Sequence, residues 1–140
     1  MRTRSRRAAS RRSGRPVASP NSTRPRGRRL GWGSAQKTEY NGATYASKSE
    51  AAYAAHLDVL KKAGLVTRWE GQVKWPLVVN GVKVCGFVPD FKVYGKGGAW
   101  WLVEVKGMET AVWKLKRKLF AALHPKVDYR VVKAREALGL

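Results

Sequence analysis

The chain has 140 residues, enough for one domain and a tail, and its composition of 44% hydrophobic and 27% charged residues is that of a globular protein. Its formal net charge of +20 and pI near 10.9 indicate a polyanionic partner, most often nucleic acid and less often an anionic membrane surface. The single cysteine, Cys85, excludes an intramolecular disulfide. No apolar stretch approaches the roughly 20 residues that span a bilayer, and none follows the basic N-terminus as a signal peptide requires. We therefore expect a cytoplasmic protein without a membrane partner.

Residues 1–38 hold eleven arginines and Lys37 but no acid, giving them a charge of +12, whereas residues 39–140 carry +8. Such a segment buries too little apolar surface to offset chain entropy. The sequence therefore predicts a disordered arginine-rich tail over 1–38 and a folded domain over 39–140. The tail would bind polyanions without sequence preference, and its candidate nucleic-acid-binding residues include Arg24, Arg26, Arg28 and Arg29.

Two alternatives remain for this tail. It is rich in Arg and Ser and free of acids, as organelle transit peptides are, although its prolines and glycines interrupt any apolar helical face. It could also be the product of an upstream start codon.

Patterned structure is expected from Tyr40 onward. Ser47 and Glu50 form a capping-box pattern, and the Ala- and Leu-rich run that follows stops at Gly64, which predicts a helix from about Lys48 to Ala63. Several short strands should follow, because the next segments are rich in β-branched and aromatic residues. These segments, with a turn at Asn80-Gly81, are Val66–Glu70, Val73–Val79 and Val82–Val93.

A glycine-rich turn at Gly95–Gly98 joins the last of these segments to a strand-like run from Trp100 to Gly107. The pattern predicts an antiparallel hairpin centred near Gly97. In that register Asp90 and Glu104 are cross-strand partners, with Cβ atoms about 4.5 to 5.5 Å apart. Like charges so placed are destabilising, and a divalent cation would offset the repulsion.

The remaining sequence predicts one helix and one strand. Apolar residues recur at helical spacing from Thr110 to Leu123, and His124-Pro125 ends the run. Val127–Lys133 is the last strand candidate. The apolar residues of this second helix are Val112, Leu115, Leu119 and Ala122. The resulting order of helix, strands, helix and strand is that of an α/β chain without an internal repeat.

Further charged groups should join the carboxylate pair. Glu104 and Lys106 are two residues apart on one strand and so share a face, while Val103 and Val105 point to the core. Glu50 belongs to the helical stripe expected to pack inward, where a carboxylate is unusual unless it has a functional role such as binding a metal. The other members of that stripe are Tyr53, Ala54, Leu57 and Leu60.

Three carboxylates and a lysine on one sheet face would make a site of hard oxygen ligands, suited to Mg²⁺ or Mn²⁺ and poorly suited to zinc. In phosphodiester hydrolysis the metal would polarise the phosphoryl oxygen and lower the pKa of the attacking water, and Lys106 would orient that water or stabilise developing charge. With two histidines and one cysteine, a zinc site or a histidine-based nuclease site is hard to build. Cys85, His56 and His124 are therefore expected to be structural or incidental.

Pro89-Asp90 and Glu104-Val105-Lys106, preceded by Glu50, resemble the motif of the PD-(D/E)XK nuclease superfamily, which has the restriction-endonuclease-like fold. More narrowly, four segments resemble a family of small phage-encoded proteins of unassigned function with this fold. The resemblance spans residues 40–132 and leaves the tail outside. The four segments are Tyr45–Ala51, the segment around Gln72, Val88–Phe91 and Val103–Gly107.

This resemblance implies a mixed central sheet flanked by helices and a metal-dependent DNA endonuclease acting in the host cytoplasm. It implies Asp90, Glu104 and Lys106 as catalytic residues. Glu50 matches the helical acid of Holliday-junction resolvases and similar branches, and it is expected to be an auxiliary metal ligand. Branched DNA is the favoured substrate, because the chain has no room for a separate sequence-reading domain and a flexible basic arm grips the backbone of any sequence. A junction-cutting enzyme needs paired active sites, so a homodimer is left open.

Each residue also has a simpler interpretation. Glu50 could be only the capping-box acid, Lys106 an edge-strand gatekeeper, and Gln72 a group that hydrogen-bonds the local backbone. A basic run in the second helix could be a solvated face or could track phosphates, and its nucleic-acid-binding candidates, together with Lys48, are Lys114, Arg117 and Lys118. The second hypothesis for function is accordingly a non-catalytic nucleic-acid-binding protein that uses the basic tail.

Overall fold

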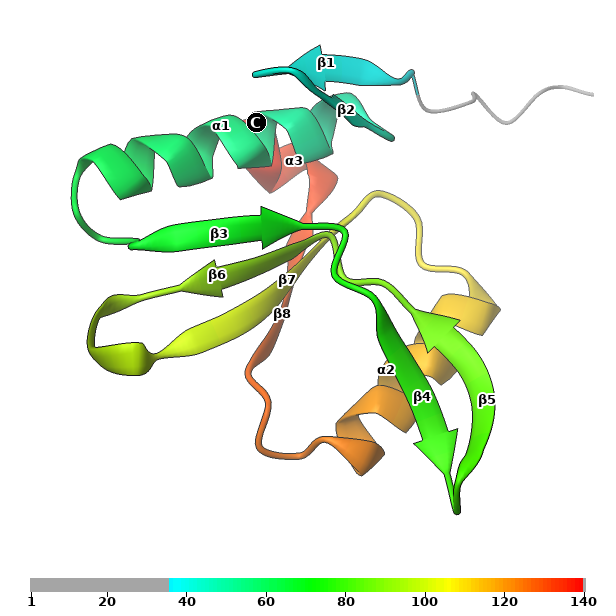
Figure 1. Ribbon diagram of the computed structural model, residues 1–140. Helices are drawn as coiled ribbons and strands as arrows, with labels where there is room; N and C mark the ends of the chain where they lie inside the picture. The colour runs from blue at the N-terminus through cyan, green and yellow to red at the C-terminus, as the bar shows by residue number, and fades with distance from the viewer. Residues whose placement is uncertain (1–35, 140) are drawn as a thin grey trace, which may run out of the picture. The chain divides into compact units, whose positions relative to one another are not determined.

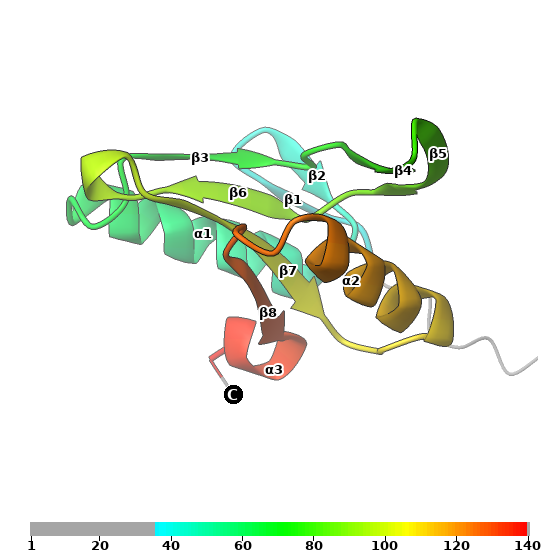
Figure 2. The ribbon, with the colours of Figure 1, turned by 90° about the horizontal axis from the view of Figure 1, so that it is seen from below.

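A four-stranded mixed sheet forms the centre of residues 36–139, the part of the chain that this computed structural model describes (Figure 1 and Figure 2). In spatial order its strands are β3 (Arg68–Gly71), β6 (Phe91–Tyr94), β7 (Trp100–Lys106) and β8 (Tyr129–Lys133). The first three pair antiparallel, and β8 pairs parallel to β7. The expectation of a mixed central sheet in an α/β chain is confirmed.

Three α-helices accompany the sheet in the described residues: α1 (Lys48–Lys62), α2 (Ala111–Leu123) and α3 (Ala134–Ala137). The first two agree with the predicted helices, because their ends carry local signals. Ser47 and Thr110 cap their N-termini through side-chain oxygens, and Gly64 follows α1 in the left-handed conformation at φ 72°. Helix α3 was not predicted. None of the described helices is long and apolar enough to cross a membrane.

Two further hairpins lie outside the central sheet. They consist of β1 (Thr38–Tyr40) with β2 (Ala43–Tyr45), and of β4 (Trp75–Val79) with β5 (Val82–Phe87). Asn41 and Asn80 both have φ 48° and are followed by glycines at positive φ, as tight hairpin turns require. The second turn was predicted, whereas the first hairpin was missed. Since β1 begins at Thr38, ordered structure starts inside the predicted 1–38 tail, of which residues 1–35 lie outside the described part.

The predicted strand segment Val82–Val93 is wrong as a single unit. It divides into β5 and β6, which belong to different sheets, and the fully buried Pro89 lies between them. Proline has no N–H to donate to a sheet ladder, so strand pairing stops there. The segments predicted from Val66 and Val73 likewise begin later, at β3 and β4. The division leaves Asp90 immediately before the first residue of β6.

Alternation along β6 and β7 gives the central sheet two buried faces. Val103 and Val105 pack with α1 in one core, whereas Leu102 packs with α2 and the β4–β5 hairpin in the other. The predicted inward stripe of α1 is confirmed for its apolar members, because Ala54 and Leu57 are buried.

The predicted apolar face of α2 needs correction. Val112 and Leu115 are exposed, and the residues that α2 buries are Trp113 and Phe120. Phe120 packs against the rings of Phe87 and other aromatic residues of the second core. The N-terminal turn of α2 consequently brings Trp113 to the same sheet face as Glu104 and Lys106.

Candidate functional site

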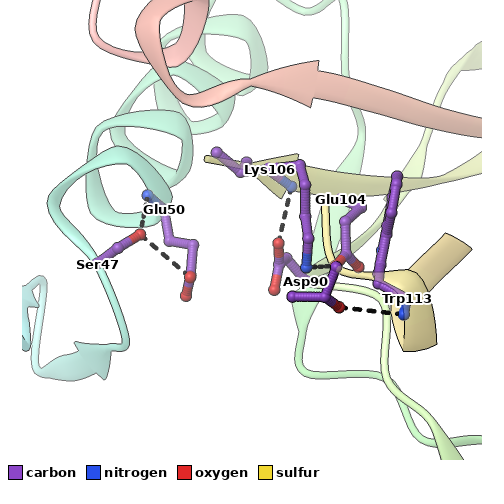
Figure 3. Close-up of polar contacts among 8 residues, drawn as sticks. Ser47, Glu50, Asp90, Glu104, Lys106 and Trp113 are labelled. Carbon is purple, nitrogen blue, oxygen red and sulfur yellow. Dashed lines mark hydrogen bonds and ion pairs between the residues drawn. The ribbon is translucent and has the colours of Figure 1, made fainter. Parts of the chain in front are cut away.

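Asp90 and Glu104 lie side by side at the start of β6 and near the end of β7 (Figure 3). The β6–β7 ladder reaches Phe91 opposite Val103, so its next position sets Asp90 opposite Glu104 in the predicted register. Asp90 Oδ2 accepts a hydrogen bond of 2.7 Å from the backbone N–H of Val105. The prediction that the hairpin brings these two carboxylates together is confirmed.

The carboxylate pair is electrostatically costly in its charged form. Burial, reinforced by the charge of Glu104, raises the pKa of Asp90 to about 7, although the Val105 N–H opposes this shift. Burial also raises the pKa of Glu104, a residue that is 8% exposed, while Lys106 favours its charged form. Without a cation, the pair therefore carries a fraction of a proton at neutral pH.

Lys106 supplies the positive charge next to the pair, as the sequence predicted. Its Nζ lies 3.4 Å from Glu104 Oε1 and 5.0 Å from the centre of the Trp113 ring. The guanidinium of Arg117 lies 5.5 Å from the same ring centre. Trp113 thus contacts two cations and holds the lysine close to the carboxylates through cation–π attraction.

The second oxygen of Glu104 is suited to a metal. Glu104 Oε2 is buried and makes no hydrogen bond of normal geometry within residues 36–139, although the nearby Trp113 indole N–H favours the charged form of this carboxylate. A buried carboxylate oxygen without a partner is costly, and a divalent cation would satisfy it. Mg²⁺ typically binds through one or two carboxylates and keeps several waters, so Asp90 and Glu104 fit this ion.

Glu50 does not complete the expected set of three carboxylates. In the part of the chain that the structure describes, no group of three or more His, Cys, Asp or Glu side chains is placed to hold a metal. Ser47 Oγ donates to Glu50 Oε1 at 3.1 Å (Figure 3). The Ala46 N–H donates to Glu50 Oε2 at 3.2 Å. Glu50 is therefore the capping acid of α1. Its charge still reaches the site, because it raises the pKa of both Asp90 and Glu104.

Two aromatic residues near Glu104 were missed in the sequence. Trp113 Nε1 and Tyr129 OH are buried and, within the described residues, have no partner of normal geometry. Both lie close to Glu104, since the indole N–H favours the charged form of this glutamate, and burial followed by the charge of Glu104 raises the pKa of Tyr129. The seven-residue spacing of Trp113 and Phe120 was the available signal, because it places both rings on one helical face.

The structure describes some of the residues predicted to contact nucleic acid. Lys114, Arg117 and Lys118 are exposed on α2 and line a cavity of about 370 Å³, in which Lys114 Nζ lies 3.8 Å from Glu109. Lys48 is exposed at the first residue of α1. Arg24, Arg26, Arg28 and Arg29 lie outside the described residues.

The remaining polar candidates have structural roles. Gln72 adopts φ 55°, and its backbone N–H donates to the carbonyl of Asp90 at 2.8 Å, so it fixes the chain beside the site. His124 Nε2 accepts a hydrogen bond from Trp75 Nε1 at 3.0 Å, as expected of a structural histidine. A separate cavity of about 650 Å³ contains Asp58, which accepts hydrogen bonds from the Tyr40 hydroxyl and the Trp69 indole. That carboxylate is thus already satisfied.

Comparisons with known proteins give one match. Neither the curated proteins nor the solved structures contain a match to this chain. Residues 32–137 match a family described as "Protein of unknown function (DUF1064)", and the matched segment contains every residue of the carboxylate site. Because the match covers most of the chain, the protein belongs to the DUF1064 family.

Proposed function

We propose that this protein is a Mg²⁺- or Mn²⁺-dependent endonuclease that hydrolyses phosphodiester bonds in DNA, with a fold and motif of the PD-(D/E)XK type. The observation that carries the proposal is the buried Asp90–Glu104 pair beside Lys106, in which one glutamate oxygen makes no hydrogen bond of normal geometry within residues 36–139. The order of helix, hairpin, helix and parallel strand supports the same assignment.

Asp90 and Glu104 would hold the metal, which when bound supplies polarisation of the phosphoryl oxygen and acidification of the attacking water. Asp90 would give up its residual proton as the ion binds, because a nearby cation favours the carboxylate. Lys106, kept in place by Glu104 and Trp113, would donate hydrogen bonds to the developing charge on the phosphate. Glu50 would add negative potential from its capping position.

The substrate we propose is branched DNA of phage or host origin, cut in the cytoplasm by a homodimer. The domain is too small for a separate sequence-reading module, and a basic surface binds the phosphate backbone regardless of sequence. Lys114, Arg117 and Lys118 on α2 would supply part of that surface, with Lys48 and the arginine tail as further contacts.

Cleavage of labelled duplex, flapped, single-stranded and four-way-junction DNA tests this function. We expect cutting in Mg²⁺ or Mn²⁺, none in EDTA, and a rate at least about a hundredfold lower in Asp90→Asn and Lys106→Ala. Lys96→Ala is the matched control, because Lys96 is an exposed lysine in the turn that precedes β7, whereas Lys106 is the last residue of this strand. If no substrate is cut, the enzyme proposal fails, and if Asp90→Asn cuts normally, the site assignment fails.

A non-catalytic nucleic-acid-binding protein is the second candidate, favoured by the concentration of +12 of the charge in residues 1–38. In that case removal of residues 1–37 should abolish most DNA binding. An endonuclease should instead keep metal-dependent cutting at low salt after the same deletion.

A further inference from the structure

Three basic side chains surround a cavity where β7 and β8 end. Because these strands are parallel, their carboxyl ends, Lys106 and Lys133, meet at the same edge of the sheet. The cavity has a volume of about 410 Å³ and is lined by Lys106, Gly107, Glu109, Lys133, Ala134 and Arg135. Three cations and one acid thus border a single hollow.

Within residues 36–139, carboxylates balance the charge of this cavity only in part. Lys106 and Lys133 are register partners, and like charges directly opposite each other on neighbouring strands repel. Lys106 pairs with Glu104, and Glu109 lies 3.8 Å from Lys114. Among the described side chains, no carboxylate lies within ion-pair distance of Lys133 or Arg135. Both side chains are exposed, and the nearby Glu136 carboxylate accepts a hydrogen bond from the backbone N–H of Lys133 at 3.2 Å without forming an ion pair with either cation. An anion in the cavity could therefore bind both.

We propose that this cavity binds a backbone phosphate of the nucleic acid next to the phosphate that is cut. The inference rests on the proposed function and extends it to Lys133 and Arg135, which were not among the residues predicted to bind nucleic acid. Lys106 contacts Glu104 and also lines the cavity, so a phosphate held there lies beside the carboxylate pair.

The basic cavity adjoins a second group of basic residues on α2, and Glu109 lies at the boundary between the two. Glu109 lines both the present cavity and the one formed by Lys114, Arg117 and Lys118 on α2, so the two hollows adjoin. A nucleic-acid strand crossing the active site would contact cations on both sides of Glu109. This acid opposes binding of the polyanion, and removing its charge should strengthen binding.

The test measures DNA binding separately from cleavage. The affinity for a fluorescent DNA duplex is measured over a series of salt concentrations. The proteins compared are full-length Asp90→Asn and three double variants, in which Lys133→Ala, Arg135→Ala or Glu109→Gln is combined with Asp90→Asn. Loss of one phosphate contact should lower the slope of log affinity against log salt by about 0.9 and weaken binding about tenfold at 0.1 M salt. We expect this for both basic variants, and tighter binding for Glu109→Gln.

Lys96→Ala in the same background is the control and should leave the slope unchanged. Tighter binding of Glu109→Gln is opposite in sign to the loss expected from a damaged site, so this variant still tests the proposal if a basic variant unfolds. Unchanged slopes in Lys133→Ala and Arg135→Ala, or unchanged affinity in Glu109→Gln, would overturn the phosphate site. If the variants bind DNA as expected but the protein with native Asp90 never cuts DNA, the proposed function fails while the phosphate site stands.

Discussion

The carboxyl group of Asp90 is held between opposing influences. Burial and the neighbouring Glu104 favour its protonated form, whereas the N–H of Val105 favours the carboxylate. The net result, a pKa of about 7 compared with 3.8 for a free aspartate, makes this residue the main pH-sensitive group of the site. Its protonation state should therefore affect both stability and metal binding.

In EDTA, the free energy of unfolding should fall as the pH rises from about 4 to 7. Over this range native Asp90 keeps a proton that the unfolded chain has already released, so each increase in pH favours unfolding, by a total on the order of a few kcal/mol. Asp90→Asn removes the titrating group and should flatten the profile. Urea unfolding at pH 4.5, 6 and 8 measures the effect, and equal slopes in both proteins would contradict the assigned cause.

The sequence predicted the positions of some residues at the site but not of others. The Gly95–Gly98 turn fixed the hairpin register and so set Asp90 opposite Glu104. The position of Glu50 on an inward stripe was compatible with either a ligand or a cap, and only the hydrogen bonds from Ser47 and Ala46 decide between them. The roles of Trp113 and Tyr129 depend on how α2 packs across the sheet, which local patterns do not specify.

Helix α2 covers the sheet face that carries the site, and a buried aromatic cluster anchors it. Phe120 is 1% exposed, with ring centres 4.8 Å from Phe87 and 5.4 Å from Tyr129. The exposed Leu115, at 68%, is on the opposite side of the same helix. The helix therefore offers a matched pair of positions for measuring how strongly it is held.

Phe120→Ala should lower the free energy of unfolding by about 3–5 kcal/mol, because it removes a buried ring and leaves a cavity. Leu115→Ala should change it by no more than about 0.5 kcal/mol, since an exposed side chain loses little burial. Denaturant unfolding of both variants gives the comparison. Similar losses in the two would show that the helix packs through the face first predicted from Val112 and Leu115.

At the scale of elements, local chemistry decided what could be predicted. The capping box at Ser47 marked the start of α1, and apolar spacing located α2. Turn residues mark all three hairpins of residues 36–139, but the Asn41-Gly42 signal of the first hairpin was overlooked. The face of α2 was ambiguous because two sets of apolar residues share its helical period. The division of Val82–Val93 between two sheets depends on Pro89 being buried at their junction, which is a property of the tertiary structure.

For the whole domain, Mg²⁺ should act as a stabilising ligand. At a Mg²⁺ concentration a hundredfold above the dissociation constant, the melting temperature should rise by roughly 10 °C. The rise should be larger at pH 8 than at pH 6, because Asp90 must lose its proton to bind the ion. Asp90→Asn should abolish the rise. Thermal unfolding in Mg²⁺ and in EDTA checks both statements.

Glu50→Ala separates the cap from the metal site in the same measurement. The variant should lose about 1 kcal/mol of stability in EDTA, because the start of α1 loses its capping acid. Most of its response to Mg²⁺ should remain. A variant of normal stability whose Mg²⁺ response is lost would instead make Glu50 a ligand.

The two neighbours of β7 in the sheet, β6 and β8, can pair with it at different times during synthesis of the chain. Its antiparallel partner β6 precedes it by a short turn, whereas its parallel partner β8 follows only after the whole of α2. Closing the shorter loop costs less entropy, so the hairpin with Asp90 and Glu104 can form early in synthesis, before Lys133 and Arg135 exist in the nascent chain. A chain emerging from the ribosome would then present its two acids first and the basic edge of the site last.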